Sequence, residues 1–337
     1  MTKGTKAFRI IICVLLTLNI LWSALWGAAF VSFMTSKVII DDYGIWVRGV
    51  QVTVRNRRDV LDDGTVSYDP VSNTLTFDNA VIEWDYTVLF AKQDLRVELI
   101  GENKFICKDA ESMPAIYIAQ STLNKNLCIE GDGSLTLELQ NISKEMIGIA
   151  ADDVTIAADV TITTPNCTGI TKGIACDSSL MLLNKATLTV QSGAGSHSTA
   201  VRVRGNVFLE EGTTLNASIV DGSTVSSSAV NINGDLFVGK NASVNVTSDD
   251  QTASVIECLR VTGFLELDAG AKVTAKSKSK PAIESYGSME INKGATVTAD
   301  TAGEGADLLC YGALVNKGGT VQGEVNALGG IHNKDGN

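Results

Sequence analysis

The chain has 337 residues, with 31 glycines, only four prolines and a formal net charge of −11. Its N-terminal residues Lys3, Lys6 and Arg9 are basic, and the rest of the chain carries a net charge of −14 (−11 − 3). An acidic body argues against nucleic-acid binding, which requires basic surface to neutralise phosphates. The length suits either more than one ordinary domain or one long solenoid.

The N-terminal segment predicts export. Ile10 to Met34 is 25 residues without a charge, and a helix of that length, at about 1.5 Å per residue, crosses a hydrocarbon core of about 30 Å. The preceding basic residues favour a cytoplasmic N-terminus and an extracellular body. We therefore expect a cytoplasmic tail at 1–9 and a single-pass transmembrane signal anchor at 10–34, in the cell membrane. The alternative is a signal peptide cleaved near Gly27-Ala28-Ala29, which would give a secreted protein.

Beyond this segment the sequence repeats. INKGATVTAD (291–300) and VNKGGTVQGE (315–324) share an apolar residue, Asn-Lys-Gly and Thr-Val. Similar copies extend backwards at intervals of 24–29 residues. Each copy closes on an apolar residue: Leu135, Ile162, Leu188, Leu215, Val244, Val273, Val297 and Val321, with Phe105 as an earlier member.

Two pairs of apolar columns precede each closing residue. Each pair has period 2, which predicts a short strand with one face inward. The nearer pair includes Leu265 and Leu267, Met289 and Ile291, and Ala313 and Val315; the earlier pair includes Ile256 and Cys258, Ile283 and Ser285, and Leu308 and Cys310. Three strands per repeat, each stacked on its copies, predict an all-β parallel β-helix solenoid of about nine coils. An antiparallel sandwich would not give columns that recur once per coil.

The turns and boundaries follow from the same alignment. Three residues before the closing residue stand Asp132, Asp159, Lys185, Gly212, Asn241, Gly270, Gly294 and Gly318. Most of these residue types tolerate positive φ, so we expect a corner there. The expected organisation is an N-terminal cap and leading strands at 35–73, the β-helix at 74–325 and a polar C-terminal tail at 326–337.

The cysteines are predicted to be mostly unpaired. Cys176, Cys258 and Cys310 share one inward column, in which Cys258 and Cys310 lie two coils apart. That separation is about 9.6 Å, beyond the limit of about 7 Å for a disulfide. We expect small buried thiols at these positions. Cys13 lies in the anchor, and the pairing of Cys107, Cys128 and Cys167 stays open.

No catalytic motif is present in the sequence. It has no HExxH, GxSxG, P-loop or dinucleotide fingerprint, and we assign no catalytic residue. The enzymatic alternative is a polysaccharide lyase or glycoside hydrolase on the β-helix, which needs suitably placed carboxylates. Its candidates are Glu257 and Glu284, expected to stack in one outward column with Arg202.

Three acids form a candidate calcium site. Asp152 and Asp177 each follow an inward residue on neighbouring coils, with Asp153 beside them. Carboxylates about 4.8 Å apart repel, and a bound Ca²⁺ would relieve the repulsion. The alternative is that these acids are hydrated at a corner.

Two further groups are candidate ligand-binding residues. Tyr286 and Tyr311 follow inward residues in adjacent coils and should stack outward, where aromatic faces can hold sugar rings. The segment AKSKSKP (275–281) places Lys276, Lys278 and Lys280 in one loop that could meet an anionic glycan. The alternatives are a cross-strand pair that stabilises the sheet and a solvated loop.

The segment GIWVRGVQVTVRNRRDVLDDGTVSYDPVSNTLTFDNAVIE (44–83) resembles the opening of repeat-rich surface proteins of Gram-positive anaerobes, many labelled carbohydrate-binding-domain proteins. The resemblance rests on VQVT, DGTVSYDP and NTLTFDNA, followed by LIGENKF (99–105) and CIEGDGSLTL (128–137). It implies a right-handed parallel β-helix at the cell surface that binds polysaccharide with calcium. The resemblance is close over residues 44–140, and the later repeats are similar to that family only in their general pattern.

These observations together predict a membrane-tethered, extracellular β-helix that binds or displays polysaccharide without catalysis. The other readings are the lyase or hydrolase above and a structural adhesin whose partner is a cell-envelope protein.

Overall fold

The computed structural model describes residues 42–334, except 109–112, 120–124, 142, 166, 194–197, 221–227, 250–257, 279–280 and 303. The expected tail at 1–9 and anchor at 10–34 lie outside these residues. In the part of the chain that is described, no helix is both long and apolar enough to cross a bilayer.

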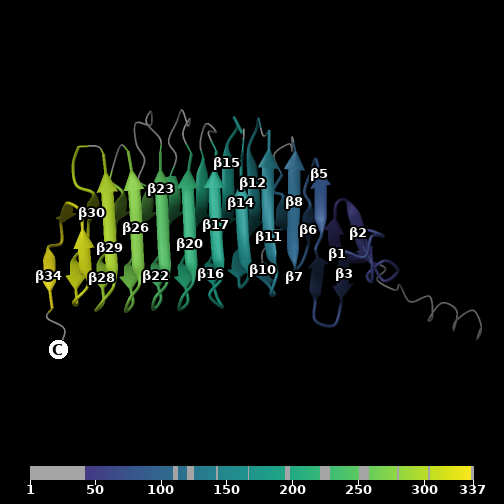
Figure 1. Cartoon of the computed structure of the whole chain (residues 1–337), viewed down its shortest axis with the longest axis horizontal. Coiled ribbons are helices and arrows are strands. Elements are labelled where there is room, and N and C mark those ends of the chain that lie inside the picture. Colours follow the sequence, from purple (N-terminus) through teal and green to yellow (C-terminus); the bar gives the residue numbers. More distant parts are fainter. Residues whose placement is uncertain are drawn as a thin grey trace, which may run out of the picture. The chain divides into compact units, whose positions relative to one another are not determined.

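The described residues form a parallel β-solenoid built from three sheets, which confirms the predicted all-β repeat fold (Figure 1). From β7 to β30 the described chain makes eight turns of three strands each, with a less regular turn at either end. Successive turns pair in parallel, so each strand hydrogen-bonds to its copies in the turns before and after.

Sheet A is formed by the strands that end each turn. In spatial order it contains β2 (Val50–Thr53), β1 (Asp42–Val47), β6 (Leu89–Ala91), β9 (Ile116–Ile118), β12 (Met146–Ala151), β15 (Thr171–Cys176), β18 (Thr199–Val203), β21 (Ser228–Ile232), β24 (Leu259–Val261), β27 (Ile283–Ser285), β30 (Leu308–Cys310) and β33 (Val325–Ala327).

Sheet B is formed by the strands that begin each turn. It contains β3 (Val66–Asp69), β4 (Thr74–Asp78), β7 (Leu95–Ile100), β10 (Asn126–Glu130), β13 (Asp153–Ile156), β16 (Leu180–Leu182), β19 (Val207–Leu209), β22 (Leu236–Val238), β25 (Leu265–Leu267), β28 (Met289–Ile291), β31 (Leu314–Asn316) and β34 (Ile331–Asn333). Because β33 and β34 continue the sheets, strands extend past residue 325, where we had expected a polar tail.

Sheet C lies between them in each turn, and its strands run side by side across Figure 1. It contains β5 (Val81–Trp84), β8 (Glu102–Lys108), β11 (Ser134–Gln140), β14 (Asp159–Thr163), β17 (Thr187–Ser192), β20 (Thr214–Ile219), β23 (Ser243–Ser248), β26 (Lys272–Ser277), β29 (Thr296–Thr301) and β32 (Thr320–Gln322).

The N-terminal edge of the solenoid is covered by antiparallel strands. β1 pairs with β2 and β6, and β3 pairs with β4, all antiparallel. An exposed edge of parallel strands would offer unpaired backbone groups to another chain, and such a cap blunts that hazard. β1, β2 and β3 lie within the cap and leading strands expected at 35–73, whereas β4 and β6 lie in the segment expected to form the β-helix.

The core is a stack of like residues, as the apolar columns predict. Leu188, Leu215 and Val244 occupy matching positions on β17, β20 and β23 and are fully buried. Burying one such side chain stabilises the fold by about 1.5–3 kcal/mol. Because each turn buries its residues against its neighbours, the turns depend on one another for stability.

The predicted columns contain register errors. Phe105 and Ile162 both pair with Leu137, so the partner of Leu188 is Val160 and not Ile162. The slip of two residues leaves the buried face unchanged because the strand period is also two. In the last repeat Leu314 pairs with Met289 and is buried, whereas Val315 pairs with the outward Glu290. Val315 was expected to point inward, and that expectation was wrong.

The corner between sheets B and C agrees with the prediction at six positions. Lys185, Gly212, Asn241, Gly270, Gly294 and Gly318 all have positive φ, between 55° and 94°. The two earliest members, Asp132 and Asp159, do not; in that region the positive φ belongs to Gly131. Left-handed backbone is sterically easy for glycine and tolerable for asparagine, which explains every residue choice except Lys185.

The corner between sheets A and B is a ladder of glycines: Gly205, Gly234, Gly263, Gly287, Gly312 and Gly329. The amide of each member donates to the carbonyl of the one before, at 2.9–3.2 Å. A Cβ on Gly287 would lie 2.2 Å from the carbonyl oxygen of Gly263, so the close stacking excludes any side chain. The ladder fixes the residues beside it, which include Tyr286 and Tyr311.

Candidate binding site on sheet A

One outward column of sheet A changes from aromatic to small to basic along the solenoid. Tyr117, Ala150, Ala175 and Arg202 lie in register on β9, β12, β15 and β18. At about 4.8 Å per strand, the backbones of Tyr117 and Arg202 are about 14 Å apart. The two alanines therefore leave a shallow floor between an aromatic ring and a guanidinium group.

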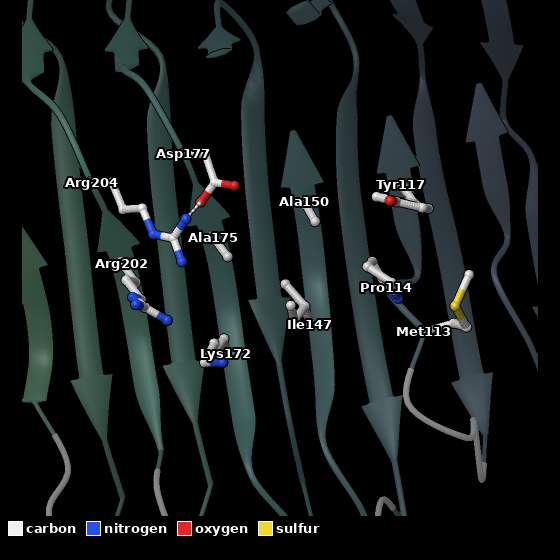
Figure 2. A pocket seen from close by; sticks show the side chains of 10 residues that line it. All are labelled: Met113, Pro114, Tyr117, Ile147, Ala150, Lys172, Ala175, Asp177, Arg202 and Arg204. Atoms are coloured by element: carbon white, nitrogen blue, oxygen red, sulfur yellow. Dashed lines mark ion pairs between the residues drawn. The ribbon is translucent and has the colours of Figure 1, made fainter. Parts of the chain in front are cut away.

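A cleft of about 420 Å³ lies over this floor, and Figure 2 shows the side chains that line it. Met113, Pro114 and Tyr117 form its apolar end. Its other end carries three cationic side chains: Lys172, Arg202 and Arg204. We call these residues, with Ala150 and Ala175, the basic groove.

The charges of the basic groove are only partly neutralised. Arg204 donates to the carboxylate of Asp177 at 3.1 Å, and Lys172 pairs with Glu145. Arg202 makes no ion pair with any residue that the structure describes, and its side chain is partly exposed. A guanidinium group presents donors in a planar fork that matches a carboxylate or phosphate. The groove can therefore bind an anionic group at Arg202.

Aromatic side chains continue the same column toward the N-terminal cap. Trp46, Phe90 and Tyr117 are successive neighbours on β1, β6 and β9. Their ring centroids are 5.3 Å and 5.6 Å apart, with the ring planes tilted by 43° and 38°. Lys92 Nζ lies 5.0 Å from the centroid of the Trp46 ring. These rings form an amphipathic strip next to the groove, suited to the apolar face of a sugar ring.

Tyr286 and Tyr311 stack on each other as the sequence predicts. Their centroids are 4.7 Å apart, their planes differ by 13°, and the residues are 38% and 41% exposed. The guanidinium of Arg260 lies 4.9 Å from the Tyr286 ring and donates to its hydroxyl oxygen at 3.2 Å. The pair is thus a second outward aromatic surface, beside sheet A and far along the solenoid from Tyr117.

The lysines expected in one loop do not all lie in a loop. Lys276 lies on β26 of sheet C, in register between Thr247 and Asp300. Lys278 follows that strand and pairs with Asp249 at 3.5 Å. Lys280 lies outside the described residues. The tyrosines follow strands of sheet A, so the lysines and tyrosines belong to different faces.

The three acids proposed for calcium are each engaged by protein donors. Asp152 is buried, and its carboxylate accepts the Lys125 amide at 2.7 Å. Asp153 accepts the amide and the hydroxyl of Ser179, and Asp177 pairs with Arg204. No group of three His, Cys, Asp or Glu in the described part of the chain lies close enough together to hold a metal ion.

The stacked trio of the enzymatic alternative is not present as expected. The outward column runs Arg202, Asn231, Arg260 and Glu284, so Arg260 takes the place given to Glu257. Glu257 itself lies outside the described residues. The register of this turn is displaced by three residues because Leu259 and Val261 are the inward pair.

No disulfide bond joins any two of the six cysteines that the structure describes: Cys107, Cys128, Cys167, Cys176, Cys258 and Cys310. Burial raises the pKa of Cys128 to about 11 and those of Cys107 and Cys258 to about 12. Burial also raises the pKa of Cys176 and Cys310. A thiol with such a pKa stays protonated at neutral pH and is a poor nucleophile. Cys258 is buried as expected, but just before β24 and outside the column of Cys176 and Cys310.

Sequence reasoning did not single out Tyr117, Lys172 or Arg204. The signal was available in the outward positions between paired inward residues, such as Tyr117 between Ile116 and Ile118. Grouping these outward residues into one site requires the strand register of four consecutive turns. The inward columns contain similar residues and leave that register ambiguous. No protein family, curated protein or solved structure matches this chain significantly.

Proposed function

We propose that this protein binds an anionic polysaccharide along the outer face of sheet A and does not transform it. The basic groove is the observation that carries the proposal. It joins an aromatic end at Tyr117 to a cationic end at Arg202 across about 14 Å of backbone. A chain of linked sugars can place an apolar ring face against Tyr117 while a carboxylate further along meets Arg202.

The aromatic strip extends the surface available to such a chain. Trp46 and Phe90 continue the row beyond Tyr117, so a longer oligosaccharide gains further stacking surface. Each added stacking contact raises the affinity for the oligosaccharide, as expected of a protein that binds a polymer. We expect longer oligosaccharides to bind more tightly than short ones.

The groups that line the cleft argue against glycoside hydrolysis. Among the described residues that line it, the one carboxylate is that of Asp177, which pairs with Arg204. Glycoside hydrolysis ordinarily requires two carboxylates that flank the scissile bond. The described residues of the groove therefore support binding and not hydrolysis.

The proposal includes a cellular localisation for the protein. The uncharged segment Ile10 to Met34 and the basic residues before it support an N-terminal membrane anchor with the solenoid outside the cell. The motifs at 44–140 support kinship with carbohydrate-binding surface proteins of Gram-positive anaerobes. A right-handed winding is also part of the proposal, since parallel crossover connections are right-handed in nearly all proteins.

Calorimetric titration tests this function. The full-length protein is titrated with hexagalacturonate and, as the matched neutral ligand, with the same hexamer after reduction of its carboxylates. We expect the acidic hexamer to bind, the neutral hexamer to bind at least about tenfold more weakly, and added salt to weaken the acidic ligand only. Equal affinity for both hexamers, or no binding of either, would contradict the proposal.

A further inference from the structure

A second cleft lies on the outer face of sheet B and has the opposite charge. Its volume is about 390 Å³, and Met181, Phe208 and Phe237 provide its apolar surface. Glu210, Glu266 and Asp268 also line it. We call these six residues the acidic platform.

The two phenylalanines of the acidic platform stack in parallel. Phe208 and Phe237 are register partners on β19 and β22, with centroids 5.0 Å apart and planes differing by 5°. Stacking covers one face of each ring, and the other face of Phe208 is turned toward its register partner Met181 on β16, so that only Phe237 has a face turned away from both neighbours. The free face of Phe237 is turned toward β25, where its register partner is Glu266. The electron-rich face of an aromatic ring attracts cations.

Glu266 sits among like charges. Its register partner on β28 is Glu290, and carboxylates directly opposite each other in a sheet repel. Lys317 pairs with Glu290 and neutralises it. Glu266 makes no ion pair with any described residue, which leaves its charge beside the free face of Phe237 uncompensated.

Two more carboxylates stand along the rim of the cleft. Glu210 and Asp268 follow the inward residues of β19 and β25, and both are exposed. Gly239 lies between them at the corresponding position after β22. A Cβ there would lie 2.5 Å from the carbonyl oxygen of Leu209, so this position must lack a side chain. The rim is therefore notched at the turn that carries Phe237.

We propose that the acidic platform binds an amino sugar with a free, protonated amine, within a polysaccharide chain. The ammonium group lies over the free face of Phe237 and pairs with Glu266, and the apolar face of the sugar ring rests on the phenylalanines. Sugar hydroxyls donate to Glu210 and Asp268, since carboxylates are strong acceptors. An N-acetylated sugar lacks the positive charge and gains none of the pairing with Glu266.

This site is independent of the basic groove. The groove lies on sheet A and selects a negative ligand, whereas the platform lies on sheet B and selects a positive one. One protein with both sites could bridge an acidic and a basic polymer. Loss of ligand binding at one site should therefore leave binding at the other unchanged.

The test is calorimetric titration of the full-length protein with a glucosamine hexamer, with the N-acetylglucosamine hexamer as the matched uncharged ligand. The glucosamine hexamer should bind at least about tenfold more tightly. Glu266→Gln and Phe237→Leu should each weaken it about tenfold, the usual scale for one charge-assisted or cation–π contact. Glu266→Gln removes the like-charge contact with Glu290, so the thermal unfolding temperature of this variant should not fall below that of the unchanged protein.

Two controls separate this site from its neighbours. Glu211→Gln removes a carboxylate that is adjacent in the chain but paired with Lys240 at 3.4 Å, and it should leave glucosamine binding unchanged. Arg202→Gln, in the basic groove, should also leave it unchanged. Equal binding of the two hexamers, no binding of either, or equal losses in Glu211→Gln and Glu266→Gln would overturn the proposal.

Discussion

The ring of Tyr311 stacks on the ring of Tyr286 from the preceding turn, 4.7 Å away and nearly parallel. The two side chains lie beside Gly312 and Gly287, which belong to the glycine ladder. The ladder holds the turns at a fixed spacing, and that spacing is close to the separation of stacked rings. An outward aromatic pair can therefore stabilise the stacking of turns as well as offer a surface.

A double-mutant cycle on Tyr286 and Tyr311 should show coupling. Tyr286→Ala, Tyr311→Ala and the double variant are compared by urea unfolding. We expect a coupling free energy of about 0.5–1.5 kcal/mol, the range for aromatic pairs. Additive effects of the two substitutions would show that the stack contributes nothing to stability.

Gly287→Ala should destabilise the solenoid because the new Cβ would lie 2.2 Å from a backbone oxygen. Backbone atoms cannot move aside without breaking the ladder, so we expect a loss of about 1–3 kcal/mol in the free energy of unfolding. Ser178→Ala is the matched control, since Ser178 stacks directly against Gly205 and already carries a Cβ. An unaltered unfolding midpoint for Gly287→Ala would refute the close stacking.

Stability should fall at alkaline pH because of the buried thiols. Burial raises the pKa of Cys107 and Cys258 from 9.0 to about 12 in the folded protein. Between pH 9 and 12 the unfolded chain therefore loses thiol protons that the folded chain keeps. The free energy of unfolding then decreases as pH rises, by at most about 1.4 kcal/mol per pH unit for each thiol.

Urea unfolding at a series of pH values measures this slope. Cys258→Ala should make the slope shallower above pH 9, and alanines already occupy positions 229 and 282 in the turns on either side. A slope that is the same with and without Cys258 would contradict burial of that thiol.

The fold was predictable because its signal is repeated. Inward columns of Leu, Ile and Val recur once per turn, and one misaligned copy does not change the architecture. The glycine ladder was equally predictable, since Gly205, Gly234 and Gly263 recur at matched positions, but the predicted corner was only the one between sheets B and C. Burial of Cys176, Cys258 and Cys310 was also predictable.

The candidate site was less predictable because it depends on register. In the segment IECLRV (256–261) two apolar pairs compete for the inward positions, and choosing Ile256 and Cys258 misplaced every outward neighbour. The choice put Glu257 opposite Glu284, where the structure has Arg260. Outward residues such as Tyr117 and Arg202 become one site only when the pairing of each strand is known.

Arg202→Gln should weaken binding of hexagalacturonate about tenfold, because it removes the one groove cation that has no ion pair with a described residue. The salt dependence of binding should also become shallower. Arg58→Gln, an exposed arginine in the cap, is the control for a general charge effect. Equal losses in the two variants would mean that the ligand senses only the overall charge of the protein.

The most direct test of the proposed function is a crystal structure of the protein with hexagalacturonate. We predict that the oligosaccharide lies across sheet A, with one sugar ring against Tyr117 and a carboxylate paired with Arg202. A ligand located on sheet C or at Lys276, with the basic groove free, would contradict the assignment of this site.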